Sequence, residues 1–134
     1  MNTYNKNDPE TIQEMFQSIA RDYDKTNAII SFNMYLRWNN SLINQALLPY
    51  DPKTILDLCC GTGDIAFSYL KKIDSHPKVY LLDFCEGMLH CAKEKAVKLR
   101  LNHHNLNYLK ADAQAIPLTD SSIDCATISY GIRN

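Results

Sequence analysis

Three aspartates and one glycine turn in this sequence could together form a ligand site. The stretch DLCCGTGD at 57–64 ends in a Gly-Thr-Gly turn and carries Asp57 four positions before its first glycine. Asp83 closes the next apolar run, and Asp112 closes the one after that. Glycines let a ligand approach the backbone closely, and a helix that starts after them directs its free N–H groups at the ligand. The pattern is typical of a nucleotide-like ligand.

Two ligand classes fit the glycine turn, and the carboxylates distinguish them. Gly61 and Gly63 fit a dinucleotide fingerprint, and Asp83 follows Gly63 by 20 residues, where such a site keeps its ribose-binding acid. Asp57 would repel a pyrophosphate but would attract an ammonium or sulfonium group. Asp112 could accept a hydrogen bond from an adenine amino group. The residues therefore favour S-adenosylmethionine over a dinucleotide. The alternative for each acid is that it only accepts hydrogen bonds from the backbone or lies exposed on the surface.

Alternating strands and helices would bring these acids to one edge of a sheet. Apolar runs predict strands at 54–60, 78–84, 106–112 and 122–131, and the stretches 64–73 and 86–101 are helix-like. Such alternation implies an α/β fold with parallel strands and right-handed crossovers. The carboxyl ends of neighbouring strands then border one crevice, where the ligand would bind.

The first part of the chain differs from this α/β pattern. Helices are predicted at 10–23 and 34–48 from apolar residues at three- and four-residue spacings. We therefore divide the chain into an N-terminal helical cap segment, 1–52, and a Rossmann-like ligand-binding half domain, 53–134.

Composition and charge exclude several other functions. The net charge of −1 and the pI of about 6.4 give no reason to expect nucleic acid as a partner. The apolar runs are too short to span a membrane, and the N-terminus does not resemble a secretory signal. Five cysteines without C-x-x-C spacing fit reduced thiols in a cytoplasmic protein. The four histidines have no spacing with acids or cysteines that indicates a metal site, so none is predicted.

Longer stretches of the sequence resemble a known family. DLCCGTGD, LLDFCEGML and the closing ISYGIRN are similar to motifs of the ubiquinone/menaquinone biosynthesis C-methyltransferases, a branch of the class I S-adenosylmethionine-dependent methyltransferases. The segment MFQSIARDYDKTNAIISFNMYLRWNN also resembles that family's entry segment, with Asn33 where a glycine is usual. The Cys59–Cys60 pair is a second departure, since many members have smaller residues there. The resemblance extends from about Glu14 to Asn134.

The resemblance implies a set of binding residues and a reaction. The substrate would be a polyprenylated quinol, either a demethylmenaquinol or a benzoquinol, methylated on a ring carbon. Asp83 would bind the ribose hydroxyls, and Asp112 with the Ala113 backbone would bind the adenine. The remaining contacts to S-adenosylmethionine would come from Gly61, Thr62, Gly63 and Ser129. The groups that would hold or take the phenol proton are Tyr23, Arg133 and Asn134.

The family also implies a sheet order of 3-2-1-4 with later strands absent, so we expect the chain to be a truncated N-terminal part. A lipid acceptor makes peripheral membrane contact an expectation, and a homodimer stays open. Two alternatives also stay open: a class I methyltransferase for another small molecule, and a non-catalytic fragment or subunit that only binds S-adenosylmethionine. A dinucleotide oxidoreductase is the remaining, more distant alternative.

Overall fold

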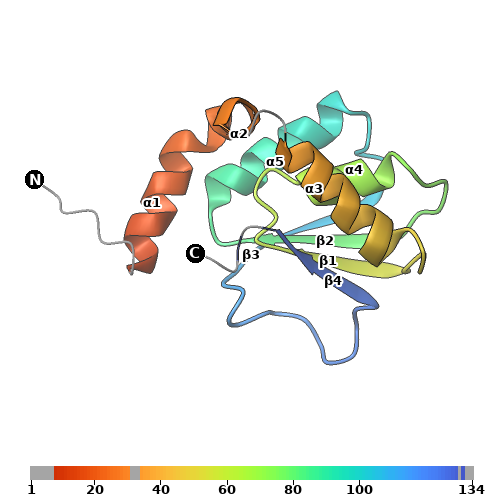
Figure 1. Ribbon diagram of the computed structural model, residues 1–134. Helices are drawn as coiled ribbons and strands as arrows, with labels where there is room; N and C mark the ends of the chain where they lie inside the picture. The colour runs from red at the N-terminus through yellow and green to blue at the C-terminus, as the bar shows by residue number, and fades with distance from the viewer. Residues whose placement is uncertain (1–7, 31–33, 130, 132–134) are drawn as a thin grey trace, which may run out of the picture.

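The computed structural model describes residues 8–30, 34–129 and 131 (Figure 1). Its sheet is parallel and has the order β3-β2-β1-β4, so the predicted order is confirmed. Helices connect β1 to β2 and β2 to β3, because parallel neighbours need a crossover connection, and a segment without a helix, 111–124, connects β3 to β4. The strands are β1 (Thr54–Leu58), β2 (Lys78–Asp83), β3 (Asn105–Lys110) and β4 (Cys125–Ile128).

The crossover helices are α4 (Asp64–Leu70), between β1 and β2, and α5 (Glu86–Lys98), between β2 and β3. Helix α4 packs on β1 and β2, and α5 packs on β2 and β3. Phe67 of α4, Ala92 of α5 and Leu81 of β2 lie in one buried cluster. In Figure 1, α3, α4 and α5 are drawn above the sheet, and the 111–124 connection runs below it. This packing fixes the carboxyl ends of β1 and β2 relative to each other.

Strand β4 is shorter than the predicted 122–131. It pairs with β1 only from Ile55 to Leu58, and the chain bends at Ser129. Before the strand, Asp124 accepts hydrogen bonds from the amides of Lys53 (3.1 Å) and Thr54 (2.9 Å). Asp124 is therefore a strand-start residue, which ties β4 to the beginning of β1.

The N-terminal helices differ from the sequence prediction. The helix predicted at 10–23 is interrupted, because Ala20 is buried against Cys85 and Met88 within a short 3₁₀ turn. A further helix follows that the apolar spacing did not predict. The segments are α1 (Pro9–Ile19), η1 (Ala20–Asp22) and α2 (Tyr23–Ile30), and then α3 (Met34–Leu42) and the π-helical η2 (Ile43–Leu47).

Helix α3 and η2 pack beside α4, and Ile43 and Leu47 are buried with Ile55 and Tyr69. Helix α1 instead contacts α5. Within the described parts of the chain, no helix is long and apolar enough to cross a membrane.

Candidate functional site

A cavity of about 560 Å³ lies at the carboxyl ends of the strands. Its volume falls within the usual range for small-molecule sites. The predicted residues that line it are Tyr23, Gly61, Asp83, Asp112, Ala113 and Ser129. The side chains of Asp57 and Thr62 are buried away from its lining, as is Gly63. Arg133 and Asn134 lie outside the described residues.

The glycine turn uses left-handed backbone at alternate positions. Gly61 has φ of +54° and Gly63 has φ of +87°. A Cβ atom at Gly63 would lie 2.5 Å from a ring carbon of the buried Phe67, so only glycine fits there. Cys59 also has positive φ, +52°, which is unfavourable for a residue with a side chain. The turn thereby brings the Gly61 backbone to the cavity wall.

Asp83 links the end of β2 to the glycine turn. Its Oδ2 accepts a hydrogen bond from the Gly61 amide (2.8 Å), and its Oδ1 accepts one from the Cys85 amide (2.9 Å). Burial raises the pKa of this carboxyl, and the backbone hydrogen bonds oppose that shift. Each carboxylate oxygen can accept more than one hydrogen bond. Asp83 can therefore hold the turn and still accept from a ligand hydroxyl in the cavity.

Asp57 lies beneath the turn, on β1, and is 2% exposed. Its Oδ1 accepts from the Thr127 hydroxyl at 3.0 Å, while its buried Oδ2 has no hydrogen-bond partner among the described residues. Burial raises the pKa of Asp57 to about 7, against the opposing effects of Thr127 and the Ala66 amide. A buried carboxyl with an unpaired oxygen is costly when charged, and a nearby cation would offset that cost.

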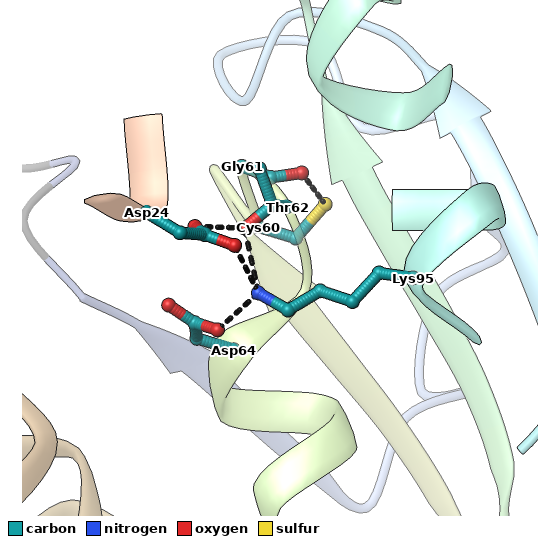
Figure 2. A network of polar contacts seen from close by, with 6 residues as sticks. All are labelled: Asp24, Cys60, Gly61, Thr62, Asp64 and Lys95. Atoms are coloured by element: carbon teal, nitrogen blue, oxygen red, sulfur yellow. Dashed lines mark hydrogen bonds and ion pairs between the residues drawn. The ribbon is translucent and has the colours of Figure 1, made fainter. Parts of the chain in front are cut away.

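Thr62 belongs to a polar network behind the turn (Figure 2). Its hydroxyl donates to Asp24 of α2 (2.6 Å) and accepts from Lys95 of α5 (3.1 Å). Lys95 also pairs with Asp24 and with Asp64 of α4, at 2.5 Å each. Burial lowers the pKa of Lys95, but the two carboxylates outweigh this effect and leave it raised. The charged Lys95 thus ties α2, the turn, α4 and α5 together.

Helix α1 closes one side of the cavity with apolar residues. Pro9, Ile12 and Phe16 line the cavity from this helix. Gln13 donates to the carbonyl of Phe84 (2.9 Å), and Gln17 accepts from the Gly87 amide (2.9 Å). These bonds hold the helix over the β2–α5 loop. The cavity therefore has an apolar wall on α1 in addition to its carboxylate-bearing side.

Tyr23 and the β3 end complete the polar side. Tyr23 lies above Gly61, since a Cβ at that glycine would be 3.9 Å from its ring. Asp112 is exposed, and its Oδ1 accepts from the Gln114 amide (2.8 Å). The Ala111 amide donates to the Asp83 carbonyl (3.2 Å), which brings the ends of β2 and β3 together. The predicted convergence of acids at the strand ends is thus present for two of the three.

Several site residues were missed from the sequence. Lys95 belongs to a Lys/Glu-rich helix face, a pattern that indicates exposure to solvent. In the structure its place in the third turn of α5 lets its ammonium pair with Asp24. The apolar spacing at 10–23 predicted a helix but did not indicate that Ile12 and Phe16 line a ligand cavity. A charged residue on the buried side of the helical pattern is the signal that could have identified Lys95.

The fold is that of the class I S-adenosylmethionine-dependent methyltransferases. A putative methyltransferase of this kind from Methanococcus maripaludis superposes with a TM-score of 0.72 at 20% identity, over 87% of this chain and 51% of that one. At this identity the similarity shows the fold alone.

The sequence comparisons define the family more closely. The model of the ubiE/COQ5 methyltransferase family matches residues 3–134, and this chain belongs to that family. A demethylmenaquinone methyltransferase of Protochlamydia amoebophila is 49% identical over 134 residues, which is all of this chain and 55% of the relative. That of Lactococcus lactis is 41% identical over 98% of this chain and 52% of its own length. The chain spans about half the length of these curated relatives.

Proposed function

We propose that the protein takes part in the S-adenosylmethionine-dependent methylation of a demethylmenaquinol ring carbon. The observation that carries this proposal is the two-sided cavity, with Asp83 and Asp112 on its polar side and α1 on its apolar side. An adenosine with a cationic tail suits the polar side, and a polyprenylated quinol is largely apolar. Two similar relatives are named demethylmenaquinone methyltransferases, which supports this acceptor.

The residues present fit S-adenosylmethionine. Asp83 and Asp112 would hold the ribose and adenine, and the Gly61 backbone would contact the methionine part, with Ala113 and Ser129 beside them. When Asp57 is ionised, its unpaired Oδ2 places a negative charge beneath the turn that a cationic ligand would stabilise. Thr62 supports the turn through its hydroxyl, which is already bonded to Asp24, and Gly63 supports it through its backbone.

The protein's own groups would assist the reaction by positioning the quinol and moving its proton. S-adenosylmethionine, when bound, supplies an electrophilic methyl group. Loss of the proton from a neighbouring hydroxyl makes a ring carbon more nucleophilic. Tyr23 lies at the cavity and would hold that hydroxyl, while Arg133 and Asn134, outside the described residues, would stabilise the phenolate. The α1 wall would exclude water from the ring.

Calorimetry and a methyl-transfer assay test the proposed function. We expect heat on titration with S-adenosylmethionine and none with NAD. Heat with NAD alone would overturn the assignment. Methyl transfer to demethylmenaquinol and to a polyprenyl benzoquinol should both be measured for this chain. Binding without transfer to either would favour a cofactor-binding subunit, and transfer only to an unrelated acceptor would favour another methyltransferase.

Asp83→Ala is expected to weaken S-adenosylmethionine binding by about 1.5–3 kcal/mol, the range for a hydrogen bond to a charged group. The substitution also removes the acceptor of the Gly61 and Cys85 amides, so the turn itself will be affected. A 2′-deoxy analogue of the ligand separates the two effects. If Asp83 binds the ribose, loss of the 2′-hydroxyl lowers affinity in the unchanged protein and has little effect in the variant. Equal losses in both would show that Asp83 does not contact the ribose.

We also propose that the protein makes peripheral contact with a membrane surface, where a polyprenylated acceptor resides. Large apolar side chains are exposed on α2 and α3, with Ile29 at 75%, Trp38 at 53% and Leu36 at 42%. Such side chains can enter the lipid headgroup region. We expect the protein to sediment with phospholipid vesicles and Trp38→Ser to weaken this, whereas Val97→Ser on α5, at a residue 61% exposed, should not. Equal sedimentation of all three proteins would exclude contact through Trp38.

A further inference from the structure

Three histidines meet at the edge of the sheet opposite the cavity. Parallel pairing of β2 with β3 begins with Lys78 opposite Asn105. His76 lies two residues before that point on one strand, and His103 and His104 directly precede it on the other. The α4–β2 and α5–β3 loops are therefore adjacent, although sequence spacing alone gave no sign of it.

The imidazoles lie close enough to share one ion. One ring nitrogen from each of His76, His103 and His104 lies within 4.8 Å of the others. The Nδ1 atoms of His76 and His104 are 3.4 Å apart, and the ring centroids of His103 and His104 are separated by 4.2 Å. A tetrahedral Zn²⁺ with bonds of about 2.0–2.1 Å to nitrogen sets its ligand atoms about 3.3–3.4 Å apart. The His76–His104 separation matches this spacing, and His103, which is exposed, has a ring nitrogen within 4.8 Å of both.

The loops that carry these histidines are held in place. The Ser75 hydroxyl donates to Asp51 (2.8 Å) beside His76. The His104 amide donates to the Leu101 carbonyl (3.0 Å), and the His104 carbonyl accepts from the Leu106 amide (2.9 Å). A ligand set on restrained backbone loses less conformational freedom when it binds an ion.

We propose that His76, His103 and His104 bind one Zn²⁺ ion, with water in the fourth position. Imidazole is a preferred ligand of Zn²⁺, and three histidines with one open position form a known coordination pattern. The six-residue strand β2 separates this site from Asp83 by about 20 Å at roughly 3.3 Å per residue. The ion therefore acts structurally, by joining the two loops, and takes no part in methyl transfer.

Zinc titration of the whole 134-residue chain tests the proposal. We expect one Zn²⁺ per chain by calorimetry and a rise in Tm of about 8 °C or more at a hundredfold excess over Kd. His76→Gln and His104→Gln should each lower the affinity about a hundredfold or more, since loss of a direct ligand exceeds the 10–100-fold cost of an outer-shell change. These positions are in loops, so the variants should fold, and circular dichroism checks this.

The matched control is His90→Gln, because His90 is 63% exposed on α5 and pairs with Glu94 rather than with the cluster. This variant should bind Zn²⁺ as tightly as the unchanged protein. Co²⁺ substitution should give visible absorption without a thiolate charge-transfer band. No saturable Zn²⁺ binding, binding retained in a His76→Gln/His104→Gln variant, or a thiolate band from the five cysteines would each overturn the proposal.

Discussion

Asp57→Asn is expected to stabilise the protein at pH 8. Between pH 5 and pH 8 the unchanged protein should lose about 3 kcal/mol of unfolding free energy through Asp57, and the variant should not show this loss. The cause is the burial that raises the pKa of Asp57 to about 7, from 3.8 for an exposed aspartate. Between these values the folded protein holds a proton that the unfolded chain releases, so stability falls as pH rises through this window. An asparagine has no such proton, and its pH profile should be flatter.

Urea denaturation at pH 5 and pH 8 measures this effect. Asp120→Asn, at an exposed position, is the control and should leave the difference between the two pH values unchanged. Parallel profiles for Asp57→Asn and the unchanged protein would show that the carboxyl is already ionised in the folded state. S-adenosylmethionine affinity should change in the opposite direction, because the variant lacks the charge that would attract a cationic ligand. A gain in stability with a loss of binding is typical of residues kept for function.

Lys95→Met is expected to lower the free energy of unfolding by about 3 kcal/mol at pH 7, near the lower end of the range for breaking a buried ion pair. Without the ammonium, Asp24 and Asp64 lose the cation that each contacts at 2.5 Å, and the Thr62 hydroxyl loses a donor. The three charged side chains are between 24% and 35% exposed, so water compensates for only part of the loss.

Urea denaturation and calorimetry together test the role of Lys95. Lys98→Met, at an exposed position on the same helix, is the control and should change stability by less than about 0.5 kcal/mol. Adding Asp64→Asn to Lys95→Met should recover part of the stability, because it removes one unpaired charge. If Lys95→Met matched Lys98→Met, the network would contribute nothing measurable.

The place of the cavity could be predicted because local pattern determines it, whereas the strand order was implied by the resemblance to the family and is confirmed. Asp83 and Asp112 each follow an apolar run, and parallel strands bring such positions to one edge. The orientation of Asp57 and Thr62 could not be predicted, since a turn residue can point toward the ligand or behind the backbone. The contacts of Lys95 and the three histidines depend on register and crossover packing between distant segments, and no local spacing encodes them.

The contacts that hold the N-terminal helices have a consequence for the newly synthesised chain. Gln13 bonds to Phe84, Gln17 to Gly87 and Asp24 to Lys95, and each of these pairs is 70 or 71 residues apart. The first helices leave the ribosome well before their partners exist. Their apolar faces therefore stay exposed to solvent until β2 and α5 have been made, and during that interval the chain is more prone to aggregate.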